Sequence, residues 1–508
     1  MFRRAISTAL LAGFLSCTLV SSFGQKKSSS PASSLETVRA EIAHNELEAA
    51  ERTLWTMISS DPNNHQAILL LGTVRLRQQR YAEAEALFRR VVQLEPHSVE
   101  GRKNLGLTLL AENKVDEAAE VLQALAADAP GDYELKVKLA ALYVGVGKFT
   151  EAISLLDSIP PAKFPASGIS VDAAALLGAG RVRDASLLIP RASKSPNIAL
   201  DLAEVFIASR QPILALATLE QISQGQKRPA KFYYLKGSAE RLKGDFASSR
   251  KSFNQALVLD PKSVPTLVAL AELAAAQKRY ADSVSLLERA NIVDPNDASV
   301  LRHLVEQAMN AGLHGTVEKT AFELVKKSSE PDDQYVAAAA LLQEREYEEA
   351  GRIFQAYVAK RPEESKAFLG LGLAYLNQQQ YAEAEKALKR ALELEASLTE
   401  AQYSLGVLYL KEGDNQTALS QFEKVLQAQP KHAKALLEAG TLYLQAGELD
   451  KASASLQASE LSDPSDPNTQ YQLSLLCNRT GKPDEARVHM EKFRALKQKT
   501  NSSSSAAN

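Results

Sequence analysis

Prolines at a constant spacing are the feature that most restricts how this 508-residue chain can fold. They recur with one fixed interval, or a multiple of it, in three series: Pro62, Pro96 and Pro130; Pro261 and Pro295; Pro362, Pro430 and Pro464, with Ala396 in the missing slot. A fixed period of about 34 residues means that each unit is one supersecondary element stacked on its neighbours. We therefore expect an array of repeats, which avoids the size limit on a single globular core.

Small residues recur at two fixed places between the prolines. The first set lies ten residues after each proline or slot: Gly72, Gly106, Ala140, Ala271, Gly372, Gly406, Gly440 and Ser474. The second set lies twelve residues further on: Ala84, Ala118, Ala152, Ser283, Ala384, Ala418, Ala452 and Ala486. A small side chain in a helix lets a second helix approach closely. The two sets therefore mark where a pair of helices cross.

A turn is expected between the two helices, seventeen residues after each proline or slot. Residues that accept the left-handed conformation stand there: Asn113, Gly147, Gly312, Gly413, Gly447 and Gly481. Such residues end a helix. The second helix then shows an apolar period of three and four, as in Ala384, Leu388, Ala391 and Leu392. The next proline ends that helix or opens the following one.

This pattern resembles the tetratricopeptide repeat. One unit reads Leu371, Gly372, Tyr375, Ala384, Leu388 and Ala391, and the next reads Leu405, Gly406, Tyr409, Ala418 and Phe422. The aromatic residue that often opens the family's first helix is mostly absent. The resemblance implies an all-α fold, an α-solenoid in which antiparallel helix pairs stack into a right-handed superhelix of about 14 units.

The chain divides by composition and repeat quality into six segments. We expect a signal peptide at 1–24, a disordered linker at 25–34, an N-terminal repeat array at 35–156, degenerate repeats or a hinge at 157–229, a C-terminal array with a capping helix at 230–499, and a disordered tail at 500–508. In the fourth segment Pro160, Pro161 and Pro165 break the period. The helices suggested there are Val171–Leu177, Arg183–Arg191, Ala199–Ser209 and Ile213–Ile222.

The first residues are typical of a secretory signal. Arg3 and Arg4 precede an apolar stretch from Ala5 to Val20, and cleavage is expected after Gly24. The stretch is short for a membrane span of about 20 residues, although an uncleaved anchor is an alternative. Cys17 follows a loose match to a bacterial lipobox, so a lipoprotein is a second alternative. We expect an exported protein of the periplasm or cell surface, without an integral span after cleavage.

Composition and side-chain spacing argue against several functional classes. Lys plus Arg (59) nearly balance Asp plus Glu (61), and no long basic run is present, so nucleic acid is not an expected partner. The seven His residues are scattered without metal-ligand spacing. Cys477 is the one thiol left after cleavage and is expected to be a small apolar residue in a helix. No catalytic constellation is visible, so we predict a protein that is not an enzyme and has neither metal nor cofactor.

Function is expected on the concave face that the first helices of a solenoid line. An apolar stripe runs along three of these helices: Leu369, Leu373 and Leu376; Tyr403, Val407 and Leu410; Leu437, Thr441 and Leu444. If it faces the groove, it could take an extended or helical segment of a partner, with Lys366, Lys411, Lys434 and Gln445 at its edges. Alternatively, these side chains pack between adjacent first helices. A clamp for a C-terminal carboxylate is not supported, because Leu107 follows Lys103 one turn later.

Three functions agree with this sequence. The first is a non-catalytic scaffold that binds other exported or envelope proteins in the groove. The second is the same array within a polysaccharide export or secretion assembly. The third is direct binding of cell-wall glycan, which would require exposed aromatic residues along the groove; aromatic residues make up only 6% of the chain. The oligomeric state and the identity of the partner stay open.

Overall fold

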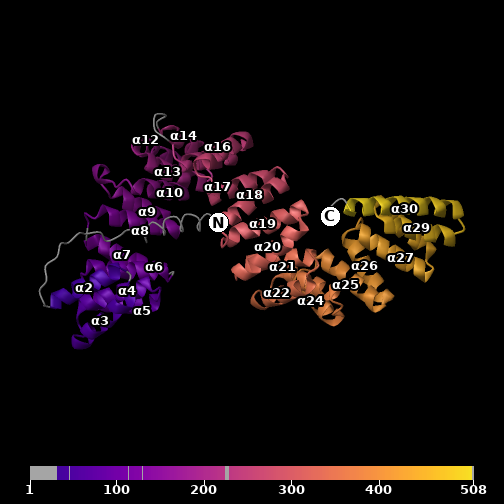
Figure 1. The fold of residues 1–508 in the computed structure, drawn as a ribbon, viewed down its shortest axis with the longest axis horizontal. Coiled ribbons are helices and arrows are strands. Elements are labelled where there is room, and N and C mark those ends of the chain that lie inside the picture. The colour runs from indigo at the N-terminus through magenta and orange to yellow at the C-terminus, as the bar shows by residue number, and fades with distance from the viewer. Residues whose placement is uncertain (1–30, 45, 113, 129, 223–227, 506–508) are drawn as a thin grey trace. The chain divides into compact units, whose positions relative to one another are not determined.

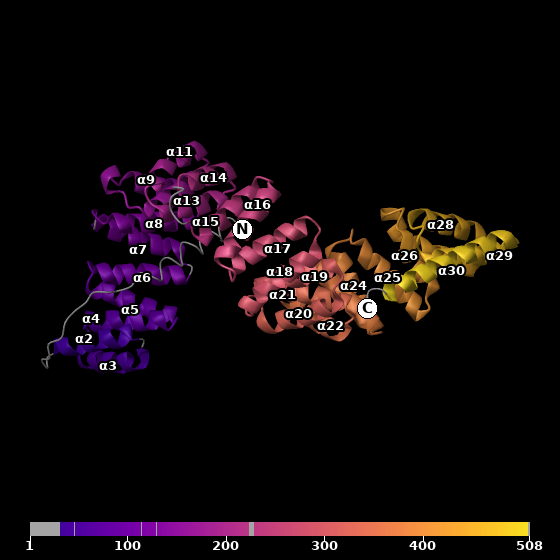
Figure 2. The same cartoon turned by 45° about the horizontal axis from the view of Figure 1, so that its top comes forward.

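The structure is a computed structural model that describes residues 31–505, apart from residues 45, 113, 129 and 223–227. All regular structure in the described residues is helical. The chain divides between Pro261 and Lys262 into two compact units, each a row of antiparallel helix pairs (Figures 1 and 2). The predicted signal peptide and its cleavage site lie outside the described residues.

The first unit contains seven helical hairpins within the described residues. The hairpin of the fifth repeat has its second helix in two pieces, and a short 3₁₀ helix, η1 (Pro161–Lys163), precedes it. The helices are α2 (Pro31–Ala43), α3 (Leu47–Ser60), α4 (His65–Arg77), α5 (Tyr81–Leu94), α6 (Val99–Ala111), α7 (Val115–Asp128), α8 (Tyr133–Gly145), α9 (Phe149–Asp157), α10 (Gly168–Gly178), α11 (Val182–Ser186), α12 (Ile189–Ala192), α13 (Pro196–Ala208), α14 (Pro212–Glu220), α15 (Ala230–Leu242) and α16 (Phe246–Leu259).

The described part of the second unit also contains seven hairpins, none of them with a helix in two pieces. Its helices are α17 (Val264–Ala276), α18 (Tyr280–Val293), α19 (Ala298–Ala311), α20 (His314–Lys327), α21 (Pro331–Gln343), α22 (Tyr347–Lys360), α23 (Ser365–Asn377), α24 (Tyr381–Leu394), α25 (Thr399–Glu412), α26 (Asn415–Ala428), α27 (Ala433–Ala446), α28 (Leu449–Ser462), α29 (Pro467–Arg479) and α30 (Pro483–Ser505). The predicted all-α solenoid of about 14 units is confirmed.

In twelve of the hairpins the turn contains one residue in the left-handed conformation, whereas the turn residue expected at Asn113 lies outside the described residues. Gly147, Gly413 and Gly447 adopt it with φ of 81°, 84° and 79°, as their place in the period predicts. Gln79 and Gln379 occupy the same place and have φ of 59° and 61°. The repeat therefore imposes this backbone conformation even where the sequence offers no glycine.

Close approach of the two helices in a hairpin explains the small residues of the first set. A Cβ atom added to Gly72 would lie 2.6 Å from Cε1 of Phe88, and one added to Gly440 would lie 2.8 Å from Cγ of Leu456. Ala84 and Ala452, from the second set, are completely buried. The crossing predicted from the two sets is confirmed.

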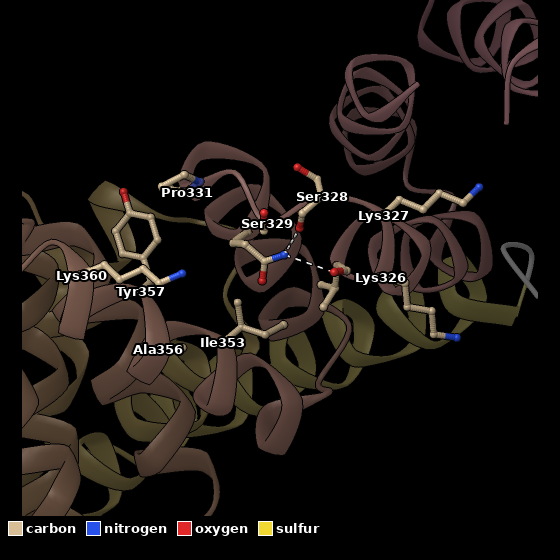
Figure 3. A pocket seen from close by; sticks show the side chains of 11 residues that line it. Lys326, Lys327, Ser328, Ser329, Pro331, Ile353, Ala356, Tyr357 and Lys360 are labelled. Atoms are coloured by element: carbon tan, nitrogen blue, oxygen red, sulfur yellow. Dashed lines mark hydrogen bonds between the residues drawn. The ribbon is translucent and has the colours of Figure 1, made fainter. Parts of the chain in front are cut away.

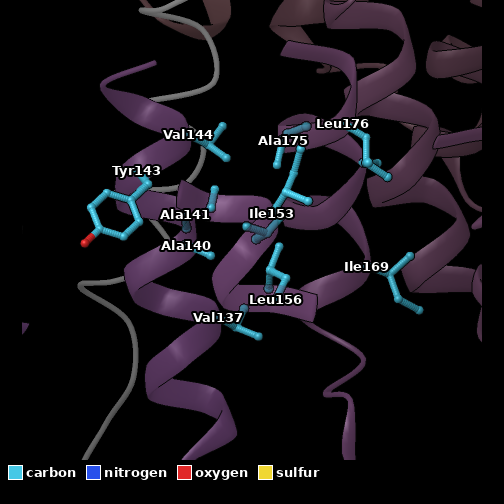
Figure 4. Close-up of a cluster of buried hydrophobic side chains, with 14 of the residues drawn as sticks. Val137, Ala140, Ala141, Tyr143, Val144, Ile153, Leu156, Ile169, Ala175 and Leu176 are labelled. Carbon is cyan, nitrogen blue, oxygen red and sulfur yellow. The ribbon is translucent and has the colours of Figure 1, made fainter. Parts of the chain in front are cut away.

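The described residues of the segment 157–229 pack into the first unit by a continuous core. A buried cluster that begins at Ala119 passes through Ile159, Ile169 and Phe206 and ends at Ala239 (Figure 4). The compact units divide at residue 261, outside this segment. Hinge bending within 157–229 stays a prediction.

The single helix expected over Arg183–Arg191 was wrong. The structure has two short helices, α11 and α12, because Pro190 has no N–H to donate to the carbonyl of Ser186. The intervening residues Leu187 and Leu188 instead bond to the carbonyls of Asp184 and Ala185. The second helix of this hairpin is thereby shortened.

Both terminal helices extend beyond the predicted array boundaries. Helix α2 begins at Pro31, inside the predicted linker 25–34, and α30 continues through Ser505, into the predicted tail 500–508. Residues 25–30 and 506–508 lie outside the described residues. The cap expected at the C-terminal end is formed by α30, which packs on α29 through Phe493 and Tyr471, whose ring centroids are 5.5 Å apart.

Candidate partner-binding surface

The first helices of neighbouring hairpins form one layer of the second unit. Helix α21 contacts α23, α23 contacts α25, and α27 contacts α29. The second helices, such as α22 and α24, contact mainly the first helices on either side of them. A row whose first helices lie closer together than its second helices curves toward the first helices. The predicted stripe belongs to that layer, because α23, α25 and α27 carry all nine of its residues.

Most of the stripe is half-buried, and one member belongs to the core. Eight residues keep part of their surface exposed: Leu369, Leu373, Leu376, Tyr403, Val407, Leu410, Leu437 and Thr441. Leu444 is only 4% exposed and lies in a cluster with Leu473 and Leu476 of the next first helix, so its assignment to the surface was wrong. The remaining eight residues are called the first-helix stripe below.

The first-helix stripe takes part in packing as well as facing solvent. Leu369 and Leu376 lie against the core cluster that contains Leu388, and Val407 and Leu410 lie against the cluster that contains Phe422. These side chains therefore take part in packing and keep some exposed surface, and binding of a partner on that surface stays a prediction. A half-buried leucine contributes to stacking and still presents an apolar edge.

Tyr403 illustrates this double environment. Its ring lies between Phe422 and His432, with centroid distances of 5.6 and 5.3 Å. Desolvation, followed by the negative charges of Glu438 and Glu400, raises the pKa of Tyr403 to about 12. The phenol therefore keeps its proton at neutral pH and can donate a hydrogen bond.

The edges of the first-helix stripe carry exposed cations. Lys366, Lys411 and Lys434 are exposed and form no ion pair within the described part of the chain. Glu400 stands among them as an exposed acid. Glu438 is half-buried beside the stripe, and its pKa is raised by desolvation and by Asp466, against the opposing effect of Lys411. The rim is basic overall.

Two further helices extend the apolar layer beyond the predicted stripe. Tyr335 and Leu342 on α21, and Tyr471 and Leu475 on α29, stand one full repeat before or after members of the stripe. Tyr335 is half-buried, and Tyr471 is 40% exposed. The same repeat period could have identified them from the sequence.

A shallow depression of about 360 Å³ opens elsewhere on the second unit, between the end of α20 and α22 (Figure 3). Lys326, Lys327 and Lys360 line it, together with Tyr357. Lys326 and Lys327 extend away from Ile353 at its floor, and Lys327 donates to the carbonyl of Pro295. These cations do not converge on a ligand position.

The described residues contain no group of three or more His, Cys, Asp or Glu side chains that could hold a metal ion. No helix in them is both long and apolar enough to cross a membrane. Cys477 is buried at 7% exposure in α29, as expected for an apolar position, and desolvation raises the pKa of its thiol.

Comparison with protein families finds repeat matches along more than half of the chain. Two family models, each described as Tetratricopeptide repeat, match residues 35–99, 75–132, 109–167, 200–264, 241–308, 341–405 and 409–476. The matches include α23, most of α25, α27 and part of the degenerate segment. Repeats of this family are typical of non-catalytic proteins that bind other proteins.

One curated relative is similar over part of the chain. It is the Cellulose synthase operon protein C of Xanthomonas axonopodis pv. citri (strain 306), with 28% identity over a match that covers 25% of this chain. The match spans 11% of the length of that relative.

Several solved structures match the chain at low identity. They include the APC/C hetero-tetramer Cut9-Hcn1 (15% identity, 96% of each chain, TM-score 0.34). MamA 41-end from Desulfovibrio magneticus RS-1 has 20% identity over 33% of this chain and 96% of its own, with a TM-score of 0.31. A tetratricopeptide repeat protein from Parabacteroides merdae ATCC 43184 has 16% identity over 48% of this chain and 98% of its own, with a TM-score of 0.37.

Proposed function

We propose that this chain, which belongs to the tetratricopeptide repeat family, is a non-catalytic scaffold that holds segments of other proteins on the first-helix stripe of its second unit. The observation that carries the proposal is the half-exposed apolar layer on α23, α25 and α27, with unpaired lysines at its edges. An apolar layer with a charged rim is the usual composition of a protein-binding surface.

The place of action that we propose is the bacterial cell envelope. This proposal rests on the signal-like residues Arg3, Arg4 and Ala5–Val20, with cleavage after Gly24. The partners would then be other exported or envelope proteins. A lipid anchor on Cys17 is the alternative form of the same proposal, and mass spectrometry of the purified N-terminus distinguishes the two.

A role in a polysaccharide export or secretion assembly is the second candidate. It is favoured by the match to a protein of a cellulose synthase operon, which covers a quarter of this chain. In such a role the chain would still act by binding proteins of the assembly. Direct glycan binding has less support, because it would require exposed aromatic residues along the groove, and aromatic residues make up only 6% of the chain.

The test is a crosslinking pulldown from envelope fractions with the chain lacking residues 1–24. Leu373→Asp combined with Leu410→Asp places two charges on the first-helix stripe, and we expect it to abolish partner capture. Circular dichroism should show helical content mostly unchanged, because both side chains are half-exposed. Collapse of the fold instead would show that these leucines serve only the core.

The matched control is Leu461→Asp, which adds a charge at the end of α28, where the side chain is 84% exposed and outside the stripe. It should capture the same proteins as the unchanged chain. Equal capture by the unchanged chain, the double variant and the control would refute the assignment of partner binding to the first-helix stripe. Residues 157–229 would then be the next candidate for the binding surface.

A further inference from the structure

Large apolar side chains are exposed on or beside the second helices in one part of the first unit. Ten such residues are exposed in the described part of that unit, and seven of them lie between residues 182 and 259. The most exposed are Val258 (74%), Ile213 (72%) and Leu187 (68%). A single exposed apolar residue is ordinary on a protein surface, whereas several on neighbouring helices are typical of an interaction site.

The second helices that carry these residues are neighbours. They are α11, α14 and α16, from three successive hairpins. Helix α12, which follows α11, contacts α14, and both α14 and α16 contact α15. Figure 1 shows α12, α14 and α16 in order along one edge of the first unit, with α10 and α13 below them. The exposed apolar residues therefore lie on the second-helix side of the unit.

The same part of the chain is basic. Residues 181–260 contain 13 Lys and Arg against 7 Asp and Glu, whereas residues 31–180 contain 14 against 20. The whole chain is nearly neutral, with 59 against 61. The exposed apolar residues of the first unit are thus concentrated where its charge is positive.

Four cations on this side form no ion pair within the described residues. Arg210 stands in the turn before α14, and Lys243 stands in the turn before α16. Arg250 and Lys251 stand on α16 itself, and all four side chains are exposed. Their charges are therefore available to an anionic ligand.

Most acids on the same helices are already engaged. Asp184 pairs with Arg181 at 2.7 Å, and Asp245 accepts from the N–H of Ser248 as the cap of α16. Glu220, at the end of α14, is exposed and has no ion pair among the described residues. One such acid against four such cations leaves this side positive.

Basic and apolar side chains are interleaved along α14 and α16. Arg210 precedes Ile213 by three residues. On α16, Lys251 and Val258 are two turns apart and so share one face of the helix. Each of the two apolar side chains therefore has a cation within two helical turns.

A ligand for this side must be anionic over two neighbouring hairpins and must accept separate apolar side chains. The surface of a membrane with anionic lipids has both properties, because its phosphates attract Lys and Arg and its headgroup boundary takes up apolar side chains. A fluid lipid layer needs no shaped cavity for Ile213 or Val258. An acidic protein would have to supply one for each.

We propose that the outer side of α14 and α16 binds the surface of a membrane that contains anionic phospholipids. Ile213 and Val258 enter the boundary between headgroups and acyl chains, and Arg210, Arg250 and Lys251 contact the lipid phosphates. The attachment is peripheral and involves residues of the first unit alone. It therefore does not depend on the proposed function, which concerns the second unit.

The test is cosedimentation of the chain lacking residues 1–24 with extruded lipid vesicles. One set consists of phosphatidylcholine with phosphatidylglycerol, and the other consists of phosphatidylcholine alone. The chain should bind the first set and not the second. Added salt should weaken the binding, because salt screens the attraction between exposed charges.

The double variant Arg250→Gln with Lys251→Gln should weaken binding to the anionic vesicles about 25-fold, since each cation near an anionic surface contributes roughly a factor of five. The matched control is Lys319→Gln with Lys386→Gln, on α20 and α24 of the second unit. Both of these lysines are exposed and form no ion pair within the described residues. The control should bind like the unchanged chain.

Entry of an apolar side chain into the lipid is measured separately. Ile213→Cys labelled with nitrobenzoxadiazole should gain emission on addition of anionic vesicles, because the label moves into a less polar environment. The same label at Leu461→Cys, where the side chain is 84% exposed on α28, should not respond. The native thiol of Cys477 is buried, which limits its own labelling. Circular dichroism checks that each variant is folded.

Several results would overturn the proposal. They are absence of binding to the anionic vesicles, an equal loss in the α16 double variant and its control, and equal emission changes at the two labelled positions. Binding of polyglutamate but not of vesicles, lost in the α16 double variant, would assign this side to an acidic protein and would also overturn the proposal. The variant with two aspartates on the first-helix stripe should bind vesicles normally, so failure of this proposal and failure of the proposed function are distinguishable.

Discussion

Gly406 of α25 and Phe422 of α26 are so close that a methyl group on Gly406 would lie 2.5 Å from Cε1 of the ring. Phe422 is completely buried, so its ring would have to displace neighbouring side chains to make room. Gly406→Ala should therefore destabilise the surrounding hairpins by about 1 to 3 kcal/mol, despite the higher helix propensity of alanine. Urea unfolding followed by circular dichroism measures the change.

Gly315→Ala is the control for this prediction. A Cβ atom at Gly315, in α20, meets nothing within 4 Å, so this variant should be neutral or more stable by up to about 1 kcal/mol. Equal effects of the two substitutions would show that helix propensity, rather than the contact with Phe422, determines the result.

Gln379→Gly should stabilise the hairpin of α23 and α24. Gln379 has φ of 61° in the turn, a conformation that costs a residue with a side chain about 1 kcal/mol and costs glycine little. Gly413→Ala, at the equivalent turn after α25, should lower the free energy of unfolding by a similar amount, because the φ of Gly413 is 84°. Thermal unfolding of both variants tests the pair of predictions. A higher unfolding temperature for both variants would contradict the explanation by the left-handed backbone conformation.

Asp172→Asn should change how the stability of residues 157–229 depends on pH. Desolvation raises the pKa of Asp172 to about 6, against the opposing charge of Arg191, while Asp157 raises it further and Arg181 lowers it. This folded-state pKa exceeds the usual value near 3.9. The carboxyl therefore contributes most to the free energy of unfolding below pH 4, and that contribution is lost as the pH rises from 4 through 6.

The Asp172→Asn variant lacks this titration. Hydrogen exchange of α10 and α13 at pH 4.5 and 7.5 should therefore show a larger gain in protection for the variant at the higher pH. Other carboxyls titrate equally in both proteins, so the difference between the proteins isolates Asp172. If the difference in protection between the two proteins were the same at pH 4.5 and pH 7.5, the raised pKa of Asp172 would be contradicted.

Arg75→Ala should destabilise the first hairpins by about 2 to 3 kcal/mol. The Arg75 side chain is only 5% exposed and donates to both carboxylate oxygens of Glu51 over 2.6 Å, with Glu83 at 3.0 Å. Its loss leaves Glu51, whose side chain is 24% exposed, with Gln78 alone, although Glu83 keeps its pair with Arg80, so the cost approaches that of a broken buried ion pair.

Arg352→Ala provides the comparison in an exposed pair. Arg352 is 62% exposed and pairs with Glu349 on the same helix, so its loss should cost less than about 1 kcal/mol. Denaturant unfolding of the two variants gives the comparison. Similar losses at the two sites would show that burial does not strengthen the Arg75 pair.

The sequence by itself determined the all-α repeat, its number of units, the crossing points at Gly72 and Gly440, and the turn at Gly413. These features follow from local chemistry that recurs once in every unit, and a period is visible without knowing which residues meet in space. It also indicated which helices carry the apolar stripe, because side chains three and four apart share one helix face.

Only the tertiary structure decided how each stripe residue divides between core and surface. Leu444 has the same place in the period as Leu410, yet it is buried because Leu473 and Leu476 of the next first helix cover it. Tyr375 and Tyr409 likewise share one place in the period, but of the two only Tyr409 has a hydroxyl partner among the described residues, Glu385. Exposure and hydrogen bonding depend on neighbours from other hairpins, and a helical period specifies the direction of a side chain but not what lies opposite it.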